Sequence, residues 1–243
     1  MQFIAKAYRS LSPWTLPGLC RICEQWNSGA ICPSCRTLHL RHPARCCRCA
    51  LPSMQTICDD CQRLPPPWHL CATALTYAEP WRSLIADYKF NGHVGLTGFW
   101  GECLRHRAAE LDMPEAAELV VPVPLSRERL RERGFNQSLL LAKALNHPRL
   151  LADGLLRLRN TQPQASLPRH ERLHNLAHAI ACNPRHVELL QNRRVLLVDD
   201  VMTTGSTLAA CTQALRHVGV AQVDVLVLAR ADHLQAPQSR PDH

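Results

Sequence analysis

One stretch of thirteen residues, VLLVDDVMTTGST at 195–207, constrains the fold more than any other feature of the sequence. It opens with an apolar run typical of a buried strand, and two carboxylates, Asp199 and Asp200, follow at once. A Thr/Gly/Ser-rich turn at 203–207 then leads into a segment with helical spacing of apolar residues. A further apolar run at 223–229 completes a strand, helix and strand, which predicts a right-handed parallel crossover in an α/β sheet.

This order of side chains predicts an anion site at the carboxyl end of the first strand. Gly205 lets backbone amides approach a ligand, while threonine and serine hydroxyls and the helix N-terminus donate to a phosphate. Asp199 and Asp200 cannot bind phosphate themselves, so we expect them to contact sugar hydroxyls or a magnesium ion. A lone TTGST would suit an ordinary capped helix as well, but the complete string favours the phosphate site.

A basic segment, VVPVPLSRERLRERGFNQS at 120–138, follows another predicted strand. Its guanidinium groups can bind a pyrophosphate through paired hydrogen bonds. A solvated basic helix neutralised by Glu128 and Glu132 is the alternative for each arginine, Arg129 included. The residues expected to bind pyrophosphate are Arg127, Arg131, Arg133, Asn136 and Gln137.

Cysteines are concentrated in the N-terminal part, with ten of the thirteen between Cys20 and Cys71. Eight of them form CxxC pairs at metal-ligand spacing, which predicts two closed four-thiolate sites for structural zinc. Iron suits the same ligands, and the pairs can combine sequentially, which we favour, or interleaved. The expected ligands are Cys20, Cys23, Cys32, Cys35, Cys46, Cys49, Cys58 and Cys61.

The remaining cysteines and a proline run indicate the domain organisation. Cys47 is left over in the second set, and four others lie in apolar surroundings typical of core thiols: Cys71, Cys103, Cys182 and Cys211. Leu64-Pro65-Pro66-Pro67-Trp68 is stiff and predicts a linker. We therefore expect a double zinc-ribbon module at 1–67, a catalytic-size α/β domain at 68–232 and a disordered tail at 233–243.

The other regular elements follow from apolar periodicity. Strands are expected at 72–78 and 118–124, in addition to those at 195–198 and 223–229. Helices are expected from Trp81 toward Gly92, and at 96–110, 135–145 and 206–217. No apolar run reaches the length that spans a bilayer, and Lys6 and Arg9 interrupt any signal peptide, so a cytoplasmic protein without a membrane span is expected.

The string at 195–207 resembles the phosphoribosyl pyrophosphate signature of type I phosphoribosyltransferases. The segments 120–138 and 157–180, with the cysteine pairs, resemble the ComF family of amidophosphoribosyltransferase-like competence proteins. In the second segment the matching residues are Arg159, Thr161, Gln164, Leu167, Arg172 and Asn175. Together the motifs cover nearly all of residues 20–230, and the resemblance implies a parallel sheet flanked by helices.

The resemblance also implies roles for individual residues. Asp199 and Asp200 would hold the ribose hydroxyls of phosphoribosyl pyrophosphate, which binds with magnesium. The 5-phosphate would be wrapped by the turn, so that the expected ligand contacts run through Val201, Met202, Thr203, Thr204, Gly205, Ser206 and Thr207. The segment 157–175 would close over the reacting centre, where Arg159 or Arg172 stabilises departing pyrophosphate; a structural surface loop is the alternative.

Two functions therefore remain open. The first is an enzyme that transfers phosphoribose to an unidentified nitrogen acceptor. The second is a non-catalytic competence protein that binds single-stranded DNA, acts with a competence helicase or other DNA-uptake proteins, and senses phosphoribosyl pyrophosphate as a ligand. The formal charge of +8 suits polyanionic partners in both cases, and an oligomer is compatible with either.

Overall fold

The structure is a computed structural model that describes residues 18–90, 92, 94–158 and 179–232. The chain forms two compact units, Met1–Arg41 and His42–His243. The division at 41/42 lies upstream of the linker expected at 64–68. The module expected at 1–67 stays a prediction, and the tail expected at 233–243 lies outside the described residues.

The first unit contains a hairpin and one helix. Strands β1 (Gly18–Leu19) and β2 (Trp26–Asn27) pair antiparallel, and α1 (Pro33–His39) follows them. Cys32 caps α1 by accepting a hydrogen bond from the Cys35 amide, and Pro33 occupies the first turn, where its missing N–H costs nothing. Strand β1 thus ends directly before Cys20, and α1 begins directly after Cys32.

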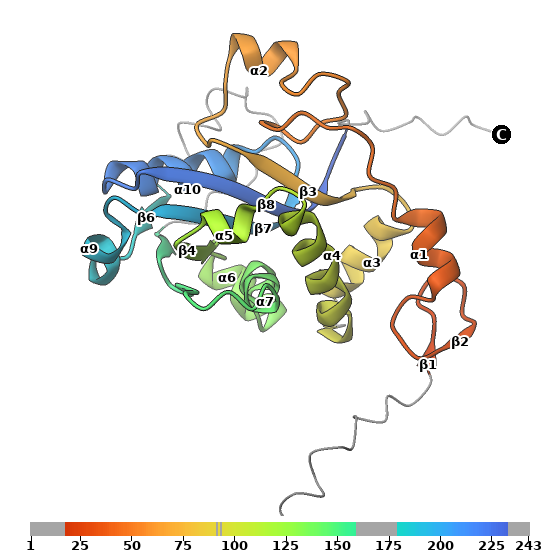
Figure 1. Cartoon of the computed structure of the whole chain (residues 1–243). Coiled ribbons are helices and arrows are strands. Elements are labelled where there is room, and N and C mark those ends of the chain that lie inside the picture. Colours follow the sequence, from red (N-terminus) through yellow and green to blue (C-terminus); the bar gives the residue numbers. More distant parts are fainter. Residues whose placement is uncertain (1–17, 91, 93, 159–178, 233–243) are drawn as a thin grey trace, which may run out of the picture. The chain divides into compact units, whose positions relative to one another are not determined.

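The second unit is built on a four-stranded parallel sheet in the order β3-β8-β7-β4 (Figure 1). The strands are β3 (Cys71–Thr76), β4 (Leu119–Pro122), β7 (Arg194–Met202) and β8 (Gln222–Arg230). The four predicted strands are confirmed. Strand β7 is central and buried over most of its length, as its continuous apolar run predicts.

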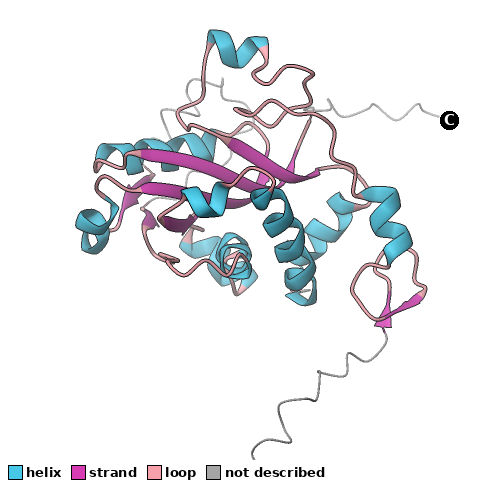
Figure 2. Ribbon diagram, in the orientation of Figure 1, coloured by secondary structure: helices cyan, strands magenta, loops and turns pink. Residues whose placement is uncertain are grey.

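Helices cover both faces of this sheet (Figure 2). Helix α10 (Ser206–His217) lies on one face, and α3 (Trp81–Phe90), α4 (Thr97–Ala109) and α7 (Gln137–Ala144) lie on the other (Figure 1). These four confirm the predicted helices to within two residues at most ends. The α/β fold class, a parallel sheet flanked by helices with a cysteine-rich N-terminal part, is therefore confirmed.

Shorter elements complete the described part of the second unit. They are α2 (Asp59–Arg63), the 3-10 turn η2 (Val94–Leu96), α5 (Met113–Ala116), α6 (Arg127–Arg133), β5 (Leu155–Arg157), β6 (Ile180–Cys182), η3 (Pro184–His186) and α9 (Val187–Leu190). Strands β5 and β6 pair antiparallel. Among all the described helices, none is both long and apolar enough to cross a bilayer.

The hydrophobic core includes part of the cysteine-rich segment 42–70. Ala50 and Trp68 belong to the same buried cluster as Met202 and Leu208, which lie at the end of β7 and in α10. The four cysteines expected as core thiols are all buried, which confirms that prediction: Cys71, Cys103, Cys182 and Cys211. The second set of metal-ligand cysteines thus lies in a segment that shares the core of the sheet.

Candidate functional site

Two adjacent carboxylates lie near the carboxyl end of β7. Ser138, in the first turn of α7, donates its hydroxyl hydrogen to Asp199 Oδ1 at 2.8 Å. Lys89, at the end of α3, places Nζ 2.9 Å from Asp200 Oδ1, and both side chains are at least 84% buried. Ligands of open parallel sheets bind beyond the carboxyl ends of the strands, so the pair lies where a ligand is expected.

The acidic pair is electrostatically unusual. Burial and, next, the negative charge of Asp200 raise the pKa of Asp199 to about 7, although the Ser138 hydroxyl, the Asp200 amide and the Lys89 ammonium oppose the rise. Two carboxylates this close cannot both ionise freely unless a cation or several donors approach. The site therefore favours an incoming group that brings positive charge or hydroxyl hydrogens.

The loop 203–207, which we call the phosphate loop, begins directly after β7. Gly205 has φ +79° and is the N-cap residue of α10. The Thr204 and Ser206 hydroxyl oxygens lie 2.8 Å apart, and the Ser206 amide donates to Thr204 Oγ1 at 3.4 Å. Hydroxyls and helix N-terminal amides thus meet at one short turn, which is the donor set that a phosphate requires.

Both the left-handed backbone and the close packing around position 205 require a glycine there. A Cβ atom at this position would lie 2.9 Å from Met202 Cε and 3.1 Å from Trp68 Cη2. Left-handed backbone already disfavours other residues there. The turn is therefore held close against Trp68, a residue that precedes β3.

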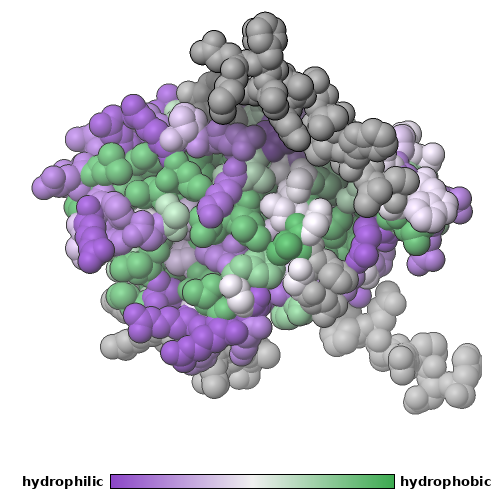
Figure 3. Space-filling model, turned by 90° about the horizontal axis from the view of Figure 1, so that it is seen from below, coloured by the Kyte–Doolittle hydropathy of each residue, from purple (hydrophilic) through white to green (hydrophobic). Residues whose placement is uncertain are grey.

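The predicted arginines lie on the short helix α6. Ser126 caps its start, and Gly134 ends it in a left-handed conformation. Arg127, Arg129 and Arg131 are exposed, whereas Arg133 is partly buried with its guanidinium 4.9 Å from the Phe90 ring centroid. Helices α6 and α7 lie in the lower part of the view in Figure 1. Seen from below, the surface of the molecule carries hydrophilic patches around a more hydrophobic area (Figure 3).

Two of the expected pyrophosphate ligands make structural hydrogen bonds. Asn136 accepts from the Ser138 and Leu139 amides as the N-cap of α7. Gln137 is buried and donates to the Lys89 carbonyl at 3.4 Å, while it accepts from Arg133 at 3.2 Å. Their binding of pyrophosphate stays a prediction. Arg159 and Arg172 lie outside the described residues.

Sequence reasoning missed Lys89 and Ser138, which contact the acidic pair. Lys89 follows Tyr88, the last buried residue of α3, and a lysine at the edge of an apolar helix face resembles any solvated lysine. Ser138 lies inside the recognised basic segment, where the arginines drew the interpretation. The position of Ser138 in the sequence gives a signal, because Ser138 lies in the first turn of a helix that follows β4, a strand that neighbours β7. No sequence signal distinguishes Lys89.

The eight predicted metal ligands form two clusters, which we call the first (20–35) and the second (46–61) cysteine cluster. Within each cluster all four sulfur atoms lie within 4.8 Å of one another, and the grouping is sequential. Cys23 and Cys32 Sγ are 3.7 Å apart, as are Cys49 and Cys58 Sγ. A tetrahedral zinc with bonds of about 2.3 Å requires about 3.8 Å between sulfurs, so both clusters can hold zinc.

Backbone amides point at these sulfur atoms. The Cys32 amide donates to Cys20 Sγ at 3.3 Å, and the Cys58 amide donates to Cys46 Sγ at the same distance. Hydrogen bonds of this kind stabilise thiolate, the form that binds metal. With four sulfurs each, neither cluster leaves a coordination position for a substrate, which suits a structural site.

Comparison with known proteins gives a family model and several relatives. The model of the phosphoribosyl transferase domain matches residues 152–242. A DNA utilization protein, YhgH, from Escherichia coli O6:H1 is 33% identical over 89% of this chain and 98% of its own length. Competence protein F of Haemophilus influenzae is 34% identical over 72% and 78%, and competence protein ComFC of Bacillus subtilis is 29% identical over 79% and 80%.

Proposed function

The chain belongs to the ComF family of competence proteins and carries a phosphoribosyltransferase domain, and from that premise we propose that it binds phosphoribosyl pyrophosphate with magnesium at the end of β7 and transfers phosphoribose to a nitrogen acceptor. One observation carries the proposal. The Asp199–Asp200 pair lies near the end of β7, and the turn that follows this strand contains Gly205, which is left-handed and caps α10. Carboxylates for the ribose hydroxyls and donors for the 5-phosphate are thus adjacent.

The proposed reaction exchanges one bond at ribose C1 for another. The C1–O bond to pyrophosphate breaks, a C1–N bond to the acceptor forms, and the acceptor nitrogen loses a proton to solvent. Positive charge develops on the sugar while negative charge grows on the leaving group, so fixed cations near pyrophosphate accelerate the step. Lys89 places a cation at the acidic pair, where Asp200 partly neutralises it, and the exposed arginines of α6 are candidates for cations near the pyrophosphate.

Magnesium would neutralise part of the pyrophosphate charge and carry it into the site. The raised pKa of Asp199 is the feature of this chain that suits such a group, because an incoming cation favours the ionised carboxylate. Zinc would occupy the two cysteine clusters and stabilise the fold around them rather than take part in the reaction.

Binding is tested by calorimetry with phosphoribosyl pyrophosphate and magnesium on the zinc-loaded chain. Turnover is tested by pyrophosphate release with a panel of purine, pyrimidine and small amine acceptors. The Asp199→Asn/Asp200→Asn chain is expected to lose both signals. Asp153→Asn is the matched control, because this carboxylate instead contacts Asn183 and His186.

The two signals separate the two proposals for this site. Binding together with release for one acceptor supports the transferase. Tight binding without release for any acceptor rejects transfer and favours a ligand-sensing protein. Absence of binding to the wild-type chain rejects the site altogether.

A second function, single-stranded DNA binding, is favoured by the exposed arginines Arg127, Arg129 and Arg131 on one short helix. The name of the YhgH relative associates that protein with DNA, and the two competence proteins suggest a role in DNA uptake. Phosphate contacts release counterions, so affinity for an oligonucleotide should fall steeply with salt. Replacing the three arginines with glutamine should flatten that slope; an unchanged slope would reject α6 as the DNA contact.

A further inference from the structure

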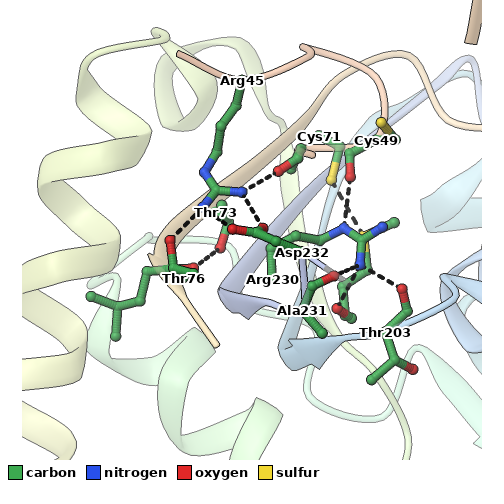
Figure 4. A network of polar contacts seen from close by, with 12 residues as sticks. Arg45, Cys49, Cys71, Thr73, Thr76, Thr203, Arg230, Ala231 and Asp232 are labelled. Atoms are coloured by element: carbon green, nitrogen blue, oxygen red, sulfur yellow. Dashed lines mark hydrogen bonds and ion pairs between the residues drawn. The ribbon is translucent and has the colours of Figure 1, made fainter. Parts of the chain in front are cut away.

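Arg230, the last residue of β8, connects the second cysteine cluster to the phosphate loop (Figure 4). Its Nε donates to the carbonyl of Cys49 at 2.9 Å. Its Nη1 donates to the carbonyls of Met202 at 3.1 Å and Thr203 at 2.5 Å. One buried guanidinium thus holds the backbone of a metal-ligand residue and the backbone where the phosphate loop begins.

Trp68 makes a second connection between the same two regions. Its indole N–H donates at 2.6 Å to the carbonyl of Arg48, which lies between Cys46 and Cys49 of the second cluster. The far edge of its ring lies against Gly205, within 3.1 Å of where a Cβ would stand. Trp68 is 4% exposed, so it cannot move without opening the core.

The segment that carries the second cluster is itself fixed to the sheet. Arg45 bonds Asp232 at 2.7 Å and the Thr76 hydroxyl at 2.5 Å, and also donates to the Ala50 carbonyl at 2.6 Å. The Cys71 amide, at the start of β3, donates to the Cys47 carbonyl at 2.8 Å. These contacts fix the chain on both sides of the Cys46–Cys49 turn, so the turn itself can move little while the four cysteines of the cluster hold together.

We propose that Arg230 is a positioning residue that couples metal occupancy of the second cysteine cluster to the conformation of the phosphate loop. Four thiolates on one ion fix the Cys46–Cys49 turn and so the Cys49 carbonyl. The planar guanidinium group of Arg230 bonds the Cys49 carbonyl and also the carbonyls of Met202 and Thr203. When the Cys49 carbonyl is fixed, the guanidinium is fixed, and it then orients the Met202 and Thr203 carbonyls. The anion-binding amides after Thr203 are thereby held ready for a ligand.

Hydrogen exchange followed by mass spectrometry tests this coupling on the zinc-loaded full chain without any ligand. Arg230→Met should speed exchange about tenfold in peptides from 46–51 and from 202–207 together, because buried charged hydrogen bonds are lost on both sides. Exchange in the first-unit hairpin 18–27 should not change. Arg216→Met, the same substitution at an exposed arginine of α10, is the matched control.

Coupling also predicts that the effects do not add. Disabling the second cluster with Cys46→Ser/Cys49→Ser should speed exchange of the phosphate loop in the wild-type background and add clearly less in Arg230→Met, where Trp68 still connects the two regions. Cys20→Ser/Cys23→Ser, which disables the first cluster, should leave the loop unchanged. Additive effects, or equal effects of the two cluster variants, would overturn the proposal.

A measurement on the unsubstituted chain covers the case in which a variant fails to fold. As a chelator withdraws zinc, loop exchange should rise together with that of 46–51 and independently of 18–27. A loop that stays protected while 46–51 opens would overturn the proposal.

The coupling rests on the proposed function only for the identity of the loop's ligand. Ribose 5-phosphate should bind Arg230→Met about tenfold more weakly than wild type. Failure of ribose 5-phosphate to bind the wild-type chain rejects the proposed function, while the exchange results still decide the coupling.

Discussion

The two cysteine clusters have the same spacing and the same donor atoms but different surroundings. The first lies in the compact unit Met1–Arg41, where its described hydrogen bonds join residues of its own hairpin and helix. The second shares a core with the sheet, and Arg230 links its backbone to the phosphate loop. CxxC spacing therefore predicts where a metal can bind, but tertiary contacts decide what the metal supports.

The largest expected difference follows from removing metal ligands. Cys46→Ser/Cys49→Ser should destabilise the sheet unit by about 4 kcal/mol, because a structural metal contributes its binding energy to folding. That loss corresponds to a fall of about 8–16 °C in the melting temperature of a domain this size. Calorimetric melting measures it, with Cys20→Ser/Cys23→Ser as the paired variant. Equal shifts in the two variants would remove the contrast between the clusters.

A smaller effect is expected from Arg45, which fixes the second-cluster segment. Arg45→Met should cost about 3 kcal/mol, because it leaves Asp232 buried without its partner; the two side chains are 5% and 18% exposed. Arg63→Met, which breaks the exposed Arg63–Asp60 pair of α2, should change stability by less than about 0.5 kcal/mol. Urea unfolding compares the two. A loss of stability in Arg45→Met as small as that in Arg63→Met would mean that the segment is held mainly by its other contacts.

Gly205 tests the contact between the phosphate loop and Trp68. Gly205→Ala should cost about 2 kcal/mol through backbone strain and crowding, and should weaken ribose 5-phosphate binding more than tenfold. Gly92→Ala has a similar φ of +65° but nothing within 4 Å of the added Cβ, so about 1 kcal/mol and unchanged binding are expected. Melting and calorimetric titration of both variants decide it; matching losses of affinity would argue against the Trp68 contact.

The pH dependence tests the acidic pair, which is the other part of the proposed site besides the phosphate loop. Asp199 keeps its proton to a pKa of about 7 in the folded chain, whereas it ionises near 3.8 when unfolded. Its contribution to the stability of the ligand-free chain therefore falls as pH rises from about 4 to 7. Binding of phosphoribosyl pyrophosphate with magnesium needs the carboxylate, so affinity should rise up to about tenfold per pH unit below 7 and level off above it.

Titrations in two buffers of different ionisation enthalpy would detect the proton released on binding at pH 6.5. Asp199→Asn should bind weakly at every pH and release no proton. A wild-type affinity that does not change between pH 6 and 8 would contradict the shifted carboxyl.

Features that depend on local sequence patterns could be predicted, whereas contacts between residues far apart in the sequence could not. The strands, the main helices and both cysteine clusters follow from apolar periodicity and ligand spacing, because each depends on residues close in the sequence. The roles of Lys89 and Arg230 do not, because Asp200 lies far from Lys89 in the sequence, Cys49, Met202 and Thr203 lie far from Arg230, and an isolated basic residue has no distinguishing pattern. Trp68 lies in the segment that the sequence predicts to be a linker, and its contact with Gly205 is not predictable because the two residues are 137 positions apart.

Zinc release is the most direct test of the claim that the second cluster and the phosphate loop act together. A chelator should withdraw the two zinc ions in two phases, assigned with the Cys20→Ser/Cys23→Ser chain. Because coupling between two sites is reciprocal, phosphoribosyl pyrophosphate should slow only the phase of the second cluster, and Arg230→Met should weaken that protection. Equal slowing of both phases, or none while the ligand is bound, would contradict the account.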